Sequence, residues 1–207
     1  MTGRDVFELL DLSTYFNQDG ISSDEDRTDG DFAGTGRTYP AEDLPSSNSI
    51  LRCDNVLFRF PDKRDGAKNN IALEGQRIPV PMHPYESLHL LGVSAGTSLE
   101  DTVRFFFADG VSEEAFLGLS SSRRGHDLKY GERVAIQCTG FHYPSRHVYT
   151  DKLDLIYGIW MQTVPVRSYK PLLTIQLPDN PGMHVFALTL QRRYAGGSLI
   201  AHHTDKT

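Results

Sequence analysis

The side chains best suited to chemistry are concentrated in one acidic stretch, residues 11–43, DLSTYFNQDGISSDEDRTDGDFAGTGRTYPAED. It holds nine carboxylates and two arginines, so its formal charge of −7 exceeds in magnitude the net −6 of the whole chain. Carboxylates gathered on a folded loop repel one another and raise one another's pKa values unless a cation or hydrogen-bond donors neutralise them. The stretch therefore requires a physical explanation that the nearly neutral remainder does not.

Calcium is one such cation, because it accepts roughly six to eight oxygen ligands in flexible geometry. An EF-hand is excluded: with Gly30 as the loop glycine, the third position is Arg27 and the twelfth is Gly36. The better ligands lie outside residues 22–26, which resemble a flexible tip, and they are Asp11, Asn17, Asp19, Asp29, Asp31 and Glu42. A solvated loop whose Asp and Asn side chains make local turns explains the same residues equally well.

A second group of candidate residues lies in residues 140–149, GFHYPSRHVY, where His142 is followed by Tyr143. Such loops bind sugars and other hydroxylated molecules, because rings stack on apolar faces while polar atoms bond to hydroxyls. We add Tyr39 and Trp160, the only tryptophan, to this predicted ligand-binding surface. Ordinary packing of a loop at the end of a strand is the alternative interpretation.

Other chemistry has weaker support. No G-x-S-x-G motif is present, and the GTGR of residues 34–37 follows no predicted strand, as a phosphate-binding loop would. Paired carboxylates of the glycosidase kind exist by residue type alone. His89 and His184 lie in predicted strands, so we expect hydrogen-bonded structural histidines rather than bases. We therefore predict no catalytic residue.

The elements that position these residues are strands. From Ile50 onward the chain shows apolar–polar alternation punctuated by turn residues. The predicted strands cover residues 56–60, 77–81, 87–95, 102–107, 113–119, 133–141, 153–164, 171–177 and 184–191. Residues 5–10 suit either one strand or one helical turn.

The connections refine this prediction. The turn 108–110 indicates a hairpin, the prolines of residues 77–81 place that strand at a sheet edge, and residues 120–132 read as a long surface loop. Residues 178–182 read as a tight connection between the last two strands. Strands do not alternate with amphipathic helices, so we expect one all-β domain over residues 1–194, an antiparallel β-sandwich of jelly-roll type, followed by a flexible tail, 195–207.

Composition excludes several classes of protein. A pI near 5.7 without a basic cluster argues against nucleic-acid binding. No apolar run approaches the roughly 20 residues of a membrane helix, and no signal peptide is visible, so we expect a cytoplasmic protein as written, or a secreted one if a leader has been removed. Cys53 and Cys138 are too few for a disulfide framework, and Cys138, in the alternating run VAIQCTG, favours a buried free thiol over a bridge.

A family resemblance adds to this interpretation. The ordered series DLSTYFNQDGIS, DGDFAGTGRTYPAEDLP, VLFRFPD, LHLLG and LLTIQLPDNPGMHVFALTL resembles the galactose-binding-like jelly-roll modules of bacterial, especially actinobacterial, glycoside hydrolases. It spans about residues 7–191. The resemblance implies a structural Ca²⁺, placed with Asp19, Asp29 and Asp31, and a carbohydrate held by loops at one end of the sandwich. Such modules accompany a catalytic domain, which this chain does not show.

These observations lead to two hypotheses of different classes. The first is a carbohydrate-binding-like module that recognises a glycan or glycosylated small molecule without catalysis, alone or as partner of a separately encoded enzyme. The second is a stand-alone jelly-roll enzyme of specialised metabolism, of cyclase or isomerase type, acting on a small molecule in an apolar pocket. A structural interaction partner is a third alternative. Fold alone does not decide among them.

Overall fold

Side chains alternate between core and solvent along strands that have one face toward solvent. In β9 (Leu99–Phe107), Val103, Phe105 and Phe107 are buried and the residues between them are more exposed. The computed structural model describes residues 7–123, 128–145, 148–149 and 157–193, and strands account for nearly all of its regular structure. The described part of the chain contains no helix with the length and apolar character needed to cross a bilayer.

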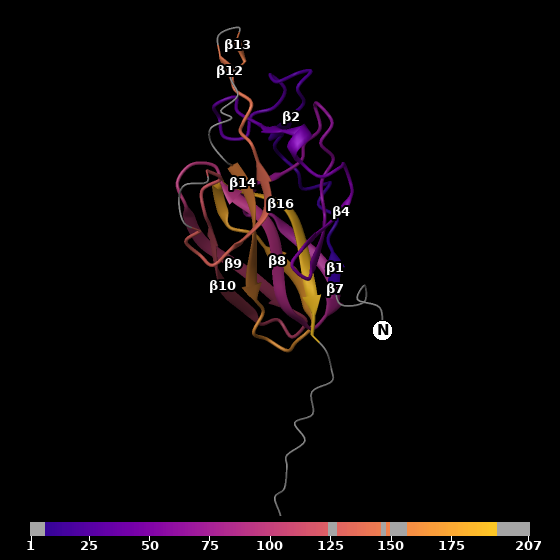
Figure 1. The fold of residues 1–207 in the computed structure, drawn as a ribbon. Helices are drawn as coiled ribbons and strands as arrows, with labels where there is room; N and C mark the ends of the chain where they lie inside the picture. Colours follow the sequence, from indigo (N-terminus) through magenta and orange to yellow (C-terminus); the bar gives the residue numbers. More distant parts are fainter. Residues whose placement is uncertain (1–6, 124–127, 146–147, 150–156, 194–207) are drawn as a thin grey trace, which may run out of the picture.

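Two antiparallel sheets form the body of the molecule (Figure 1). The larger has the order β1-β16-β8-β14-β11, with β6 also paired to β16, and its strands are β1 (Phe7–Leu9), β6 (Ile71–Glu74), β8 (Tyr85–Ser94), β11 (Arg133–Cys138), β14 (Tyr157–Pro165) and β16 (Asp179–Arg192). The smaller has the order β10-β9-β15-β7, and its remaining strands are β7 (Arg77–His83), β10 (Ser112–Leu119) and β15 (Leu172–Gln176).

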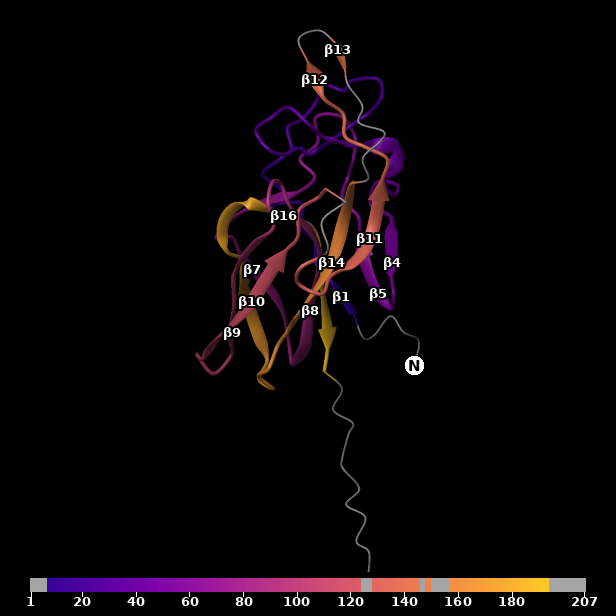
Figure 2. The same ribbon diagram turned by 60° about the vertical axis from the view of Figure 1, so that its left-hand side comes forward.

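Several short elements lie outside these two sheets. They are the parallel pair β2 (Ile21–Ser22) and β3 (Tyr39–Pro40), the 3-10 turn η1 (Ala41–Asp43), the hairpin β4 (Ile50–Cys53) and β5 (Val56–Arg59), and the pair β12 (Pro144–Ser145) and β13 (Val148–Tyr149). Figures 1 and 2 show β12 and β13 projecting from one end of the sandwich, beside the indigo-to-purple N-terminal segment. That end brings together segments far apart in the sequence.

The six-stranded sheet is covered on both faces. One face packs against the four-stranded sheet, where Leu88 and Leu90 of β8 meet Phe105 of β9. The other face, with Leu91 and Val93, packs against apolar residues of the N-terminal segment, namely Ile21, Phe32, Tyr39, Ala41, Leu44, Cys53, Val56, Phe58 and Phe60. The acidic stretch therefore also supplies core side chains, which explains why it is folded onto the sheet despite its charge.

The prediction of an all-β antiparallel sandwich is confirmed. The turn at residues 108–110 joins β9 to β10 as a hairpin, with Gly110 at φ +82° and its N–H donating to the Phe107 carbonyl. The strand predicted at residues 77–81 is β7, an edge strand. Residues 7–9 form a strand rather than a helical turn.

The prediction of a connection at residues 178–182 is wrong, and that of a loop at residues 120–132 is wrong about its exposure. The surface loop over residues 120–132 is buried at both ends, because the two carboxylate oxygens of Glu132 accept hydrogen bonds from the Ser120 N–H at 2.6 Å and its hydroxyl at 2.8 Å. The connection at residues 178–182 belongs to β16, which begins by pairing Asp179 with Glu74. Parts of several predictions lie outside the described residues, namely 5–6, 124–127, 153–156, the boundary at 194 and the tail 195–207.

Candidate functional site

Backbone pairing fixes the position of His142, which follows β11. The N–H of His142 donates to the Thr38 carbonyl at 3.0 Å, and the Thr38 N–H donates to the His142 carbonyl at 3.2 Å. Thr38 precedes β3, which pairs with β2. This bridge therefore attaches the segment after β11 to the acidic stretch, at the end of the sandwich where β2 lies (Figure 1).

Two buried hydroxyl groups orient the imidazole of His142. Nδ1 lies 2.9 Å from Oγ of Ser22, and that oxygen is in turn hydrogen-bonded to Oγ1 of Thr38. Ser22 and Thr38 are fully buried, and His142 is 2% exposed. Buried polar groups are costly unless they are paired, so this chain of three side chains holds the ring in one orientation.

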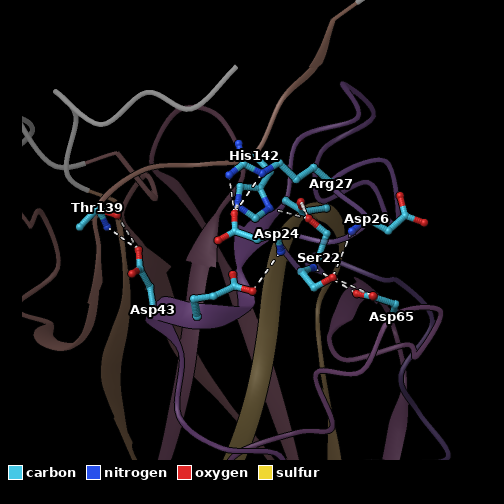
Figure 3. A network of polar contacts seen from close by, with 11 residues as sticks. Ser22, Asp24, Asp26, Arg27, Asp43, Asp65, Thr139 and His142 are labelled. Atoms are coloured by element: carbon cyan, nitrogen blue, oxygen red, sulfur yellow. Dashed lines mark hydrogen bonds and ion pairs between the residues drawn. The ribbon is translucent and has the colours of Figure 1, made fainter. Parts of the chain in front are cut away.

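Carboxylates face the other side of the ring (Figure 3). Nε2 of His142 lies 3.4 Å from Oδ1 of Asp24, an ion-pair distance rather than a short hydrogen bond. Arg27 also binds this oxygen, through Nε at 3.0 Å and through its terminal nitrogen. The N–H of Asp24 donates to Oε1 of Glu42 at 3.0 Å. A carboxylate only accepts hydrogen bonds, so the arrangement favours a proton on Nε2 and a Ser22 hydroxyl that donates to Nδ1.

These groups line a small pocket with a volume of about 140 Å³. Its lining residues are Asp24, Arg27, Pro40, Glu42, Asp43, Thr139, Gly140, Phe141 and His142. Oδ2 of Asp43 accepts hydrogen bonds from the N–H and the hydroxyl of Thr139, both at 2.8 Å. These bonds hold together the side of the pocket that Asp43 and Thr139 line. Three carboxylates and one guanidinium make the pocket net negative and rich in hydrogen-bond acceptors.

The same pocket contains the group of side chains best arranged for a metal. Within the described residues, Asp24, Glu42 and His142 form a group whose ligand atoms all lie within 4.8 Å of one another. One imidazole nitrogen with two carboxylates suits a first-row transition metal better than calcium, which prefers oxygen ligands alone. Arg27 competes for Asp24, so the geometry does not require a metal.

Asp19, Asp29 and Asp31, the calcium ligands that the family resemblance implies, do not form such a group. Oδ1 of Asp31 accepts the N–H groups of Ala33, Thr35 and Gly36, at 3.1, 2.9 and 2.9 Å, so backbone donors neutralise this carboxylate. Oδ2 of Asp29 accepts the Gly66 N–H at 2.5 Å. Backbone amides of the same loop thus bind Asp31, and the amide of Gly66, outside the acidic stretch, binds Asp29. Calcium in this segment stays a prediction, which melting curves with and without a chelator would test.

Asp19, the third predicted ligand, is a half-buried carboxyl. Its Oδ1 accepts hydrogen bonds from the Ile21 N–H at 3.3 Å and from Nδ2 of Asn69 at 2.6 Å. Burial, together with the neighbouring Asp29, raises the pKa of Asp19 to about 6. Part of the repulsion in the acidic stretch is therefore relieved by a proton held on Asp19 at mildly acidic pH.

The four predicted ligand-binding residues divide into two pairs. Tyr39 and Trp160 are 0% and 2% exposed, and each uses its polar atom internally: the Tyr39 hydroxyl donates to the Gly158 carbonyl at 2.9 Å, and Trp160 Nε1 donates to the Ser121 carbonyl at 3.1 Å. Placing them on a binding surface was wrong, because they are core residues. His142 lines the pocket, and Tyr143 beside it is half-buried, with its ring edge-on to Phe141.

His89, His184 and the two cysteines behave as expected. His89 is hydrogen-bonded through Nδ1 to the Thr163 hydroxyl and through Nε2 to Gln191, and burial lowers its pKa. His184 is hydrogen-bonded to Asn70. Cys53 and Cys138 are buried free thiols, and burial raises the pKa of Cys138 to about 12, so this thiol stays protonated and unreactive.

Sequence reasoning missed half of the site. Ser22 and Asp24 fall within the predicted flexible tip, yet Ser22 is fully buried and Asp24 faces His142. No spacing signal joins Ser22 to a histidine 120 residues away, because the contact depends on long-range pairing. Glu42 was predicted as a calcium ligand, and the structure places it beside Asp24 and His142.

Comparison with known protein families matches residues 8–194 to the AziU2-like beta-sandwich domain. The match covers most of the chain, and the protein belongs to this family. A comparison with curated proteins gave no match. The family description agrees with the sandwich in Figure 2 and says nothing of a ligand or a reaction.

Proposed function

We propose that this protein binds a small hydroxylated molecule, a carbohydrate or a glycosylated compound, in the His142 pocket without transforming it. The observation that supports this proposal is the buried imidazole of His142, held by Ser22 and Thr38 at the wall of a pocket that also contains three carboxylates. Sites that recognise hydroxyl groups use a few fixed polar groups of this kind.

The chemistry of the pocket matches that of a sugar. Carboxylates accept hydrogen bonds from hydroxyl groups, and the Arg27 guanidinium donates to hydroxyl or ring oxygens. Tyr143, adjacent to His142 in the chain, is half-buried, and we propose that its ring contacts an apolar sugar face. The pocket's volume of about 140 Å³ favours a terminal unit over a long glycan on a flat platform.

Calorimetry with common mono- and disaccharides and a glycan array test this proposal. We expect at least one saccharide to bind, and Glu42→Gln to weaken it about tenfold, because hydrogen bonds to charged groups contribute about 1.5–3 kcal/mol. Glu114→Gln is the matched control, since Glu114 pairs with Arg104 on the four-stranded sheet. Absence of binding in both assays, or equal affinity in the Glu42→Gln variant, would contradict the proposal.

A second candidate is an acid–base enzyme acting at the same pocket. The supporting observation is the contact between Nε2 of His142 and Asp24, with Glu42 nearby, because an oriented imidazole beside carboxylates can transfer protons. Prolonged incubation with each bound saccharide, followed by mass spectrometry, separates the two functions. Binding alone returns the saccharide unchanged, whereas catalysis gives a product whose formation is lost in His142→Gln.

A further inference from the structure

A second concave site lies around His184 of β16. It is a groove of about 400 Å³, larger than the His142 pocket. Its lining residues are Asn17, Gln18, Ala33, Gly34, Ala72, Glu74, Ala95, Pro181, Gly182 and His184. Half of these are alanine or glycine, so the walls leave room for a ligand to approach the histidine. His184 is 2% exposed, and its ring packs on Phe32 with centroids 4.5 Å apart.

The hydrogen bonds around His184 determine which ring nitrogen carries the proton. Nδ2 of Asn70 donates to the Gln18 carbonyl at 3.2 Å and to Oδ1 of Asn69 at 3.0 Å. Both partners are acceptors, and Oδ1 of Asn69 already accepts the Gly20 N–H at 2.9 Å. The amide of Asn70 therefore has one orientation, in which its Oδ1 faces His184. Nδ1 of His184, 2.9 Å from that oxygen, must be the donor.

This leaves Nε2 of His184 as an unprotonated acceptor. Across the part of the chain that the structure describes, the side chain of His184 makes one hydrogen bond, through Nδ1, and Nε2 is not among the fully enclosed atoms that lack a partner. Nε2 therefore retains a lone pair, and His184 is one of the residues that line the groove. Burial, together with the nearby Arg37 guanidinium, lowers the pKa of His184 to about 4, so the ring stays neutral at physiological pH.

We propose that this groove is a second binding site, which holds a small neutral molecule by accepting a hydrogen bond from its hydroxyl or amide N–H at Nε2 of His184. An acceptor that no protein group occupies can accept a hydrogen bond from a ligand donor, and such a bond adds to the affinity. The exposed carboxylate of Glu74 gives the groove a further acceptor. The positive charge of Arg37 near the ring favours a neutral donor over an ammonium group. The site does not depend on the function proposed for the His142 pocket.

Long-range ¹H–¹⁵N NMR of the histidine rings in the intact chain tests this proposal, with glycerol, D-galactose and acetamide as probes. We expect His184 to be protonated at Nδ1 alone in the free protein, and its Nε2 resonance to move as one of these probes is added. His184→Asn keeps a donor for Asn70 but removes the Nε2 acceptor, so the affinity should fall about tenfold. His89→Asn is the control, because His89 lies outside the groove.

Two results would overturn the proposal. One is a proton on Nε2 of His184 in the free protein, and the other is an Nε2 resonance that none of the three probes moves. Both measurements use the wild-type chain, so they do not depend on whether His184→Asn folds. Glu42→Gln, which changes the His142 pocket, should leave the His184 response intact, and loss of that response would show that the probes act at the other pocket.

Discussion

Nδ1 of His142 lies 2.9 Å from Oγ of Ser22, although 120 residues separate them in the chain. This contact joins the acidic stretch to the segment that follows β11, and it closes the end of the sandwich where β2 lies (Figure 1). The acidic stretch is thus both a covering layer of the core and one wall of the pocket.

The first prediction concerns this contact. Ser22→Ala removes the partner of both the His142 imidazole and the Thr38 hydroxyl, so it should lower the free energy of unfolding by about 1–3 kcal/mol. Urea denaturation measures the change. Ser23→Ala is the neighbouring control, because the Ser23 hydroxyl bonds to Asp65 at the surface, and it should cost less than about 0.5 kcal/mol. Equal losses in the two variants would show that the buried chain of hydroxyls does not stabilise the site.

The second prediction separates core aromatics from ligand-binding residues. Tyr39→Phe removes the donor to the Gly158 carbonyl, and Trp160→Phe removes the donor to the Ser121 carbonyl and some buried volume. Each should cost about 1–3 kcal/mol of unfolding free energy. Any saccharide affinity measured by calorimetry should stay within about twofold of wild type. A large loss of affinity in a variant that remains folded would show that the substituted residue contacts the saccharide, and would contradict this prediction.

The strands were predictable because alternation is a local signal. Alternation predicted a strand at residues 102–107, and its apolar residues Val103, Phe105 and Phe107 are all buried. Charge predicts burial less well, because a run of carboxylates does not show whether the apolar residues between them are buried. Phe32 and Tyr39 lie in the acidic stretch and are fully buried against the six-stranded sheet. The N-terminal segment therefore forms a layer that covers the six-stranded sheet, which its polar composition did not predict.

The site was only partly predictable. His142 was selected from its residue type, but Ser22 and Asp24 were assigned to a flexible tip, and Thr38 had no signal. Their positions depend on the bridge between Thr38 and His142 and on the parallel pairing of β2 with β3. Such pairings join residues distant in the chain, and no periodicity in a single sequence encodes them.

The third prediction concerns pH. Burial raises the pKa of Asp19 from 3.8 to about 6, so the folded state holds this proton more tightly than the unfolded chain. The contribution of Asp19 therefore favours folding below about pH 4 and is lost as the pH rises through about 6. Asp19→Asn mimics the protonated form, and it should raise the unfolding free energy near pH 7 by up to about 1 kcal/mol, a figure that allows for solvent screening of this half-exposed group. Near pH 4 the two proteins should be equally stable.

Asp62→Asn is the control, because it should change the stability in the opposite direction near neutral pH. Hydrogen bonding to Arg64 lowers the pKa of Asp62 to about 2, so its carboxylate stabilises the folded state above the unfolded pKa of 3.8. This variant should lose stability near neutral pH, and the loss should shrink as the pH falls toward about 2. Denaturation curves recorded across this range would contradict the assignment if both variants ran parallel to wild type.

The fourth prediction concerns Gly158, which precedes Trp160 by two positions in β14. A Cβ at Gly158 would lie 2.2 Å from Cζ3 of Trp160 and 2.8 Å from the Ile136 carbonyl oxygen. The indole is 2% exposed and cannot move aside without breaking its bond to the Ser121 carbonyl. Gly158→Ala should therefore cost about 3 kcal/mol or more.

The control for this variant is Gly96→Ala, because no atom lies within 4 Å of a Cβ built at Gly96. Its unfolding free energy should stay within about 0.5 kcal/mol of wild type. Thermal denaturation compares the two, and tryptophan fluorescence adds a specific reading, since Trp160 is the only tryptophan. A displaced indole meets a more polar environment, so the emission of Gly158→Ala should shift to longer wavelength. An unshifted spectrum with unchanged stability would contradict the prediction. It would mean that the indole of Trp160 does not lie against Gly158.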